Sequence, residues 1–65
     1  MKRFESKIQK DLFYWVEPVG LNINGFHVVA QAEGYPATEA YDDWFKYKKD
    51  AEEIAEKLSK GENIV

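Results

Sequence analysis

The chain has 65 residues and a formal net charge of −3 at pH 7, and 15% of its residues are aromatic. This length fits one domain near the lower limit at which a single apolar core can sustain a fold. The sequence contains no cysteine, which excludes disulfides and thiolate metal sites within it. Its acidic balance argues against a protein that binds nucleic acid by neutralising phosphates.

We do not expect the N-terminal residues to form a signal peptide. No apolar run follows the basic residues Lys2 and Arg3, as it would in a signal peptide. No stretch approaches the length of a membrane span. We therefore expect a cytoplasmic protein that does not bind membranes.

Residues 1–11 allow two interpretations. Phe4, Ile8 and Leu12 recur every four residues, as on a short helix, whereas Phe4, Ser6 and Ile8 alternate with polar residues, as on an edge strand. We favour a short helix or turn that leads into a strand.

A β-hairpin is predicted between residues 12 and 33, because Asn24-Gly25 is a strong signal for a two-residue type I′ turn. This turn would place Leu21 opposite Val28 and Glu17 opposite Ala32. Pro18 would then occupy a position whose missing N–H points away from the partner strand, which indicates an edge strand or a bulge.

The turn also fixes which side chains share a face, since neighbouring residues of a strand point to opposite sides. One face is expected to be apolar and to enter the core: Phe13, Trp15, Val19, Leu21, Ile23, Phe26, Val28 and Ala30. The other face would show Tyr14, Val16 and Val29, with His27 beside Asn22.

A long amphipathic helix is predicted from Thr38 to Lys60, with Thr38 as its N-cap and Gly61 as its stop. Its apolar stripe would pack on the hairpin through Tyr41, Trp44, Ala51, Ile54, Ala55 and Leu58. An alternative begins the helix only at about Lys48 and makes residues 43–47 a strand, giving a three-stranded sheet. Either version predicts one small α+β domain, in which a helix covers one face of an antiparallel hairpin.

No motif in the sequence indicates catalysis. A single histidine on a strand, His27, is far more often a cross-strand residue than a catalyst or ligand. Asp42 and Asp43 would point about 100° apart on a helix, so their carboxylates could not bind one metal ion or act as an acid–base pair. We interpret them as acidic residues near the helix N-terminus, where the helix dipole favours negative charge. We expect no enzyme activity, no cofactor and no metal site.

Binding is the remaining class of function, and our first hypothesis is a self-associating protein-interaction module. Its partner surface would consist of Tyr14, Val16, Val29 and Phe45, because four consecutive large apolar residues on a strand leave two of them outside the core. The small hairpin-plus-helix plan resembles that of many bacterial or phage-encoded proteins, and the resemblance implies no particular activity.

Two other hypotheses use charge. An inhibitor could imitate nucleic acid with an acidic helix face that includes Asp43 and Glu53, although interspersed lysines dilute that face. A weak single-stranded nucleic-acid binder could stack bases on Tyr14, Trp15 and His27, with the backbone steered by Lys2, Arg3, Lys7 and Lys10. The net acidity of the chain weighs against this last hypothesis.

Overall fold

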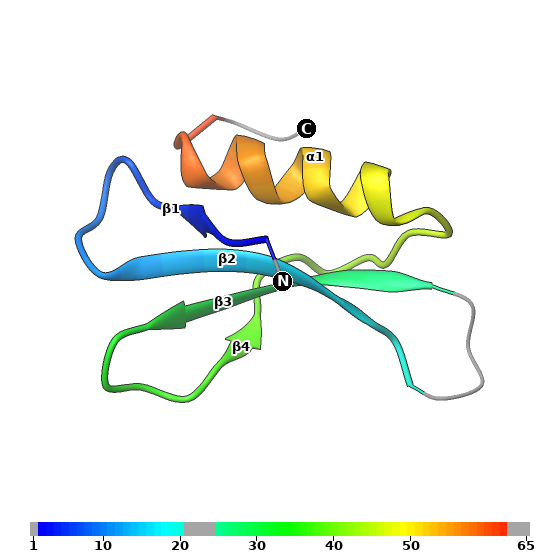
Figure 1. Cartoon of the computed structure of the whole chain (residues 1–65), viewed down its shortest axis with the longest axis horizontal. Coiled ribbons are helices and arrows are strands. Elements are labelled where there is room, and N and C mark those ends of the chain that lie inside the picture. Colours follow the sequence, from blue (N-terminus) through cyan, green and yellow to red (C-terminus); the bar gives the residue numbers. More distant parts are fainter. Residues whose placement is uncertain (1, 21–24, 63–65) are drawn as a thin grey trace.

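The protein folds into an antiparallel four-stranded sheet and one helix (Figure 1). The computed structural model describes residues 2–20 and 25–62. In chain order the elements are β1 (Phe4–Glu5), β2 (Leu12–Pro18), β3 (Phe26–Ala32), β4 (Thr38–Glu39) and α1 (Lys48–Ser59). The strands follow one another in the sheet in the order β1-β2-β3-β4. The predicted α+β class is confirmed.

The central hairpin has a different register from the predicted one. Val16 lies opposite Val28, whereas the Asn24-Gly25 turn would have placed Leu21 there. The N–H of Val19 donates to the carbonyl of Gly25 at 2.9 Å, so Gly25 is paired with Val19 and is not a central residue of a two-residue turn. The predicted type I′ turn is therefore wrong. Leu21, Ile23 and Asn24 lie outside the described residues.

The register shift reverses the two faces of β2 relative to β3, whereas Phe26, Val28 and Ala30 lie on the α1 side as predicted. A shift from Leu21 to Val16 is five residues, and any odd shift turns every side chain of the shifted strand to the other side of the sheet. Tyr14 and Val16 consequently face α1, and Phe13 and Trp15 point away from it. The predicted assignment of these four side chains was wrong.

The core lies between the sheet and α1. Val16, Val28, Ala51 and Ala55 are its buried centre, and Val28 and both alanines have no exposed surface at all. Around them pack partly buried side chains from β1, β2, β3, α1 and the segment between β4 and α1: Phe4, Tyr14, Phe26, Ala40, Tyr41, Phe45, Ile54 and Leu58. The two alanines let the helix approach β2 and β3 closely, as expected from the apolar stripe predicted for residues 51–58.

The helix has 12 residues and is about half as long as predicted. Ahead of it, the chain runs along β3: the N–H of Ala40 donates to Val28 O at 2.9 Å, and Phe45 and Phe26 exchange two backbone hydrogen bonds of 2.7 and 2.6 Å. Tyr47 then has an extended backbone and precedes the first helical turn. The alternative with a helix from Lys48 is thus confirmed, although its strand over 43–47 is reduced to the single bridge at Phe45.

The predicted stop of the helix is confirmed. Gly61 adopts a φ of 78°, its N–H donates to Leu58 O at 3.0 Å, and the N–H of Glu62 donates to Lys57 O at 3.0 Å. This pair of bonds is the Schellman motif, which requires a left-handed residue and therefore favours glycine.

The N-terminal segment combines both interpretations of residues 1–11. Phe4 and Glu5 form the edge strand β1, with Phe4 opposite Tyr14. A turn follows in which Ser6 Oγ accepts hydrogen bonds from the N–H groups of Ile8 and Gln9 at 3.2 and 3.0 Å. In the described part of the chain, no helix is long and apolar enough to cross a membrane.

Candidate binding surfaces

The side of the sheet that points away from α1 is mixed in character. Strand alternation and the observed register place ten side chains there, and we call them the polar face. They are Arg3, Glu5, Phe13, Trp15, Glu17, His27, Val29, Gln31, Glu33 and Glu39.

Trp15 is the fixed centre of the polar face. Only 7% of its surface is exposed, its indole N–H donates to Glu17 Oε1 at 2.9 Å, and the Arg3 guanidinium lies 5.8 Å from its ring centroid. Neighbouring Val29 on β3 is also buried. A buried indole with its polar atom satisfied has little freedom to move, so this part of the face is rigid.

His27 connects three strands of the polar face. Its Nδ1 lies 3.3 Å from Glu39 Oε2 on β4, and its Nε2 lies 3.8 Å from Glu17 Oε2 on β2. The cross-strand interpretation of this histidine is confirmed, with Glu17 rather than Asn22 as its partner on β2.

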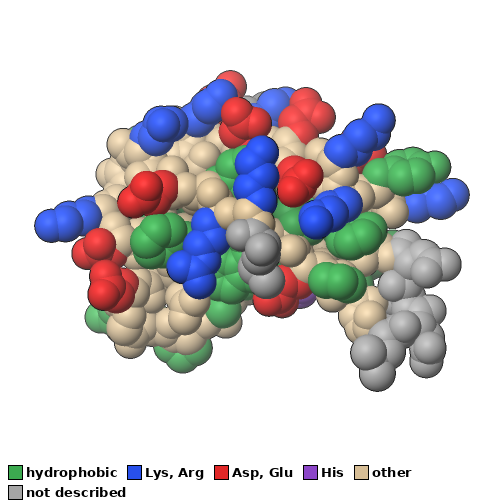
Figure 2. Space-filling view, in the orientation of Figure 1, with side chains coloured by type: hydrophobic (Ala, Val, Ile, Leu, Met, Phe, Trp, Pro, Cys, Tyr) green, Lys and Arg blue, Asp and Glu red, His purple; other side chains and the backbone are tan. Residues whose placement is uncertain are grey.

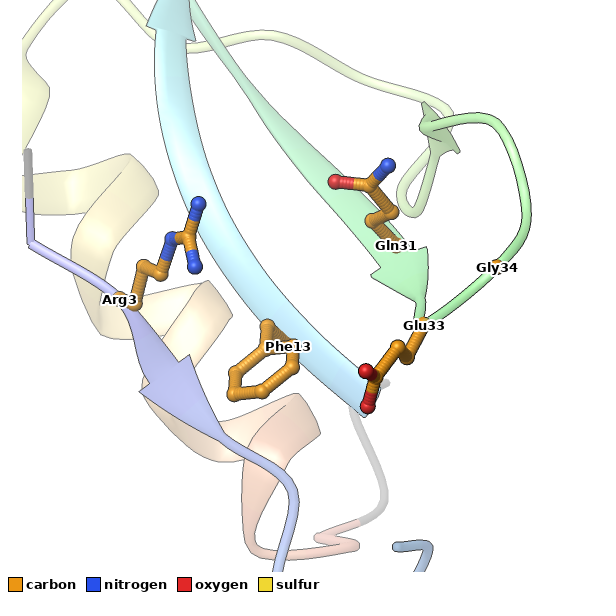
Figure 3. A pocket seen from close by; sticks show the side chains of 5 residues that line it. All are labelled: Arg3, Phe13, Gln31, Glu33 and Gly34. Carbon is orange, nitrogen blue, oxygen red and sulfur yellow. The ribbon is translucent and has the colours of Figure 1, made fainter. Parts of the chain in front are cut away.

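A hollow of about 370 Å³ opens at one end of the polar face, lined by Arg3, Phe13, Gln31, Glu33 and Gly34. Figure 3 shows the Phe13 ring between the Arg3 and Glu33 side chains, with α1 behind the sheet. The guanidinium lies 5.6 Å from the Phe13 ring centroid. The hollow therefore offers an aromatic surface with a cation on one side and a carboxylate on the other.

The polar face carries the charge imbalance of the whole protein. The chain has nine lysines and arginines and 12 aspartates and glutamates. Removing Arg3 and the four glutamates of the polar face leaves eight basic and eight acidic residues. The rest of the molecule is thus neutral in sum, and the net charge of −3 lies on the polar face.

A second surface lies at the other end of the sheet, and we call it the aromatic end. It consists of Tyr41, Trp44, Phe45 and Tyr47 together with Lys46, Lys48 and Lys49. Trp44 and Tyr47 are 54% and 55% exposed. Figure 2 shows hydrophobic and basic side chains next to one another at this right-hand end of the molecule.

The backbone of the aromatic end is held in place. Phe45 is tied to β3 by its two backbone bonds to Phe26, and its ring stacks on Tyr41 with centroids 5.8 Å apart. Trp44 lies so close to the backbone of Gly25 that a Cβ there would be 2.6 Å from its Cζ3 atom. Trp44, predicted to be in the core, is instead presented to solvent by a fixed segment.

The predicted partner residues do not form one surface. Val16 is buried and Tyr14 half-buried on the α1 side, Val29 is buried on the polar face, and Phe45 is half-buried at the aromatic end. The expectation that Tyr14, Val16 and Val29 share an outer face was wrong, because the register reverses the faces of β2.

The residues of the other two hypotheses are also dispersed. Asp43 and Glu53 are exposed, but Glu53 is paired with Lys57 at 3.6 Å, which reduces the acidity of the helix face. Tyr14 and Trp15 point to opposite sides of β2 and cannot stack neighbouring bases together.

The sequence interpretation missed the hollow and the exposure of the aromatic end. The signal for the hollow would have been the charged residues Arg3 and Glu33 near the ends of β1 and β3, and it becomes readable only with the correct register. Among residues 2–20 and 25–62, no group of three His, Asp or Glu side chains could hold a metal ion. The chain matches no protein-family model, no curated protein and no solved structure.

Proposed function

We propose that this protein is a non-enzymatic protein-interaction module, acting in the cytoplasm, whose polar face binds a basic segment of a partner protein. The observation that supports this function is the coincidence of the net charge with the hollow on one side of the sheet. In this proposal α1 shields the other side, so a partner approaches the sheet from the side of the polar face.

The hollow suits a lysine or arginine side chain. The Arg3 guanidinium already lies 5.6 Å from the Phe13 ring centroid, so an incoming cation would enter on the side of Glu33 and form an ion pair with that carboxylate at the rim. Glu5, Glu17 and Glu39 extend the negative potential along the sheet, which steers a basic segment toward the face. The buried Trp15 keeps the surface preorganised, so binding orders few additional groups.

The test is an NMR titration of the ¹⁵N-labelled protein with tetralysine, and with tetraglutamate as the control peptide. We expect tetralysine to shift the Trp15 indole signal and the amide signals of Phe13, Gln31 and Glu33, and tetraglutamate to leave them in place. Shifts spread evenly over the molecule, or larger shifts along α1, would refute the proposal.

A pair of matched variants tests the contribution of charge. Glu5→Gln with Glu33→Gln removes two charges from the polar face, and Glu53→Gln with Glu62→Gln removes two from elsewhere. Exposed ion pairs contribute about 0.2–1 kcal/mol each, so the first variant should bind tetralysine roughly 2- to 30-fold more weakly. Equal weakening by both variants would show that only the overall charge matters.

A further inference from the structure

We propose that the basic segment bound by the polar face is the aromatic end of a second copy of this chain. This inference rests on the proposed function, because it uses the same face and names its partner. It assigns the aromatic end, which the proposed function leaves unused, as the surface that docks on that face.

The aromatic end has the composition of an anchor. Trp44 and Tyr47 expose about half of their surface, and aromatic residues of this kind dominate the energy of protein interfaces when they enter a partner's hollow. The double backbone bridge at Phe45 and the contact of Trp44 with Gly25 fix the segment before it binds. An anchor that is already ordered loses little conformational entropy on docking.

The charges of the two surfaces are complementary. The aromatic end carries three lysines, Lys46, Lys48 and Lys49, and the polar face carries four glutamates with which they could form ion pairs. Lys46 Nζ lies over the Tyr47 ring, 5.6 Å from its centroid. The aspartates at positions 42 and 43 precede the lysines, and Arg3 is the cation that the polar face offers to them. The sign of the charge thus changes along both surfaces.

The aromatic end of one molecule cannot reach the hollow on the polar face of the same molecule. Phe26, at the start of β3, is bonded to Phe45 of the aromatic end, whereas Gln31, near the end of β3, lines the hollow. Five residues of a strand separate them by about 17 Å. Because the segment is tied to β3, its side chains reach a hollow only on another molecule, through a contact between two different surfaces.

Nucleic acid fits the aromatic end less well than a second copy does. Its three lysines are flanked in sequence by three acidic residues, Asp42, Asp43 and Asp50. A strand of uniformly negative phosphates meets these carboxylates as well as the lysines, whereas the polar face offers charges of both signs.

The test is a charge exchange followed by sedimentation velocity over a range of protein concentrations. One variant carries Glu5→Lys and Glu33→Lys, a second carries Lys48→Glu and Lys49→Glu, and a third carries all four changes. A control with Glu52→Lys and Glu62→Lys has the same net charge as the first variant. The second variant places acidic residues at the start of α1, where they favour the helix, so its folding is not weakened.

We expect the wild type and the control to gain mass as concentration rises. Each two-residue variant should associate about 10-fold more weakly or not at all, and the four-residue variant should recover. A 1:1 mixture of the two weakened variants should also recover, which keeps the test valid if the four-residue variant folds poorly.

Three results would overturn the inference: a wild type that stays monomeric at every concentration, a control that weakens as much as the first variant, or a mixture that does not recover. An oligothymidylate that shifts the Trp44 indole signal of a monomeric wild type would assign the aromatic end to nucleic acid instead. If self-association is absent while tetralysine still shifts the polar face, the inference fails and the proposed function stands.

Discussion

Val28→Ala tests the core between β3 and α1. Val28 has no exposed surface, and the change deletes two methyl groups, each worth about 0.8 kcal/mol in transfer free energy. The cavity left beside Ala51 and Ala55 adds roughly 1 kcal/mol. The free energy of unfolding should therefore fall by about 2–3 kcal/mol, a large part of the ~3–10 kcal/mol expected for a chain of this size.

The assay is urea unfolding followed by circular dichroism, supported by a thermal melt. With an unfolding entropy of about 2.1 cal/mol/K per residue, this loss lowers Tm by roughly 15–20 °C. Ile8→Val is the control, because it also deletes a methyl group, but from a side chain that is 71% exposed. It should change the free energy of unfolding by less than about 0.5 kcal/mol. A Val28→Ala loss no larger than that of Ile8→Val would refute the assignment of Val28 to the core.

Three further substitutions have defined outcomes. Gly25→Ala should displace the Trp44 ring and cost about 1–3 kcal/mol by overpacking, seen as a shifted indole signal; an unchanged signal would contradict the contact. Gly61→Ala places a Cβ on a residue with a φ of 78° and should lower the free energy of unfolding by about 1–2 kcal/mol. Glu17→Ala leaves the indole N–H of Trp15 without its acceptor and should cost about 1–2 kcal/mol, whereas Glu17→Gln keeps an acceptor and should lose less; equal losses in urea unfolding would argue against the bond.

The sequence predicts the fold class better than the register, and the reason lies in β2. Phe13, Tyr14, Trp15 and Val16 are all apolar, so alternation cannot decide which pair faces the helix. The choice then depends on the turn, and the pairing of Val19 with Gly25 rules out the register that a two-residue turn at Asn24-Gly25 would set. An error of five residues in register is enough to misplace Tyr14 and Val16, the candidate site residues on β2, whereas Val29 on β3 lies on the outer face as predicted.

The start of α1 is also decided by a long-range contact, because helical periodicity before Lys48 competes with hydrogen bonding to β3. The helical periodicity runs without a break from Tyr41 to Leu58, and local propensity gives no reason to stop it before Lys48. Hydrogen bonding to the free edge of β3 overrides it, because Ala40 and Phe45 satisfy Val28 and Phe26 there. Local sequence patterns do not predict such long-range hydrogen bonds, which override helix propensity. The aromatic end exists only because this segment joins the sheet instead of the helix.

The N–H of Lys7, in the turn after β1, donates to the carbonyl of Ser59 at the end of α1, at 2.7 Å. The turn after β1 and the end of α1 are therefore joined by a backbone hydrogen bond. We expect fraying of β1 to loosen the last helical turn, and fraying of that turn to loosen β1. Hydrogen exchange at the Lys7 amide should consequently report cooperative opening of both segments rather than the local mobility of a surface turn.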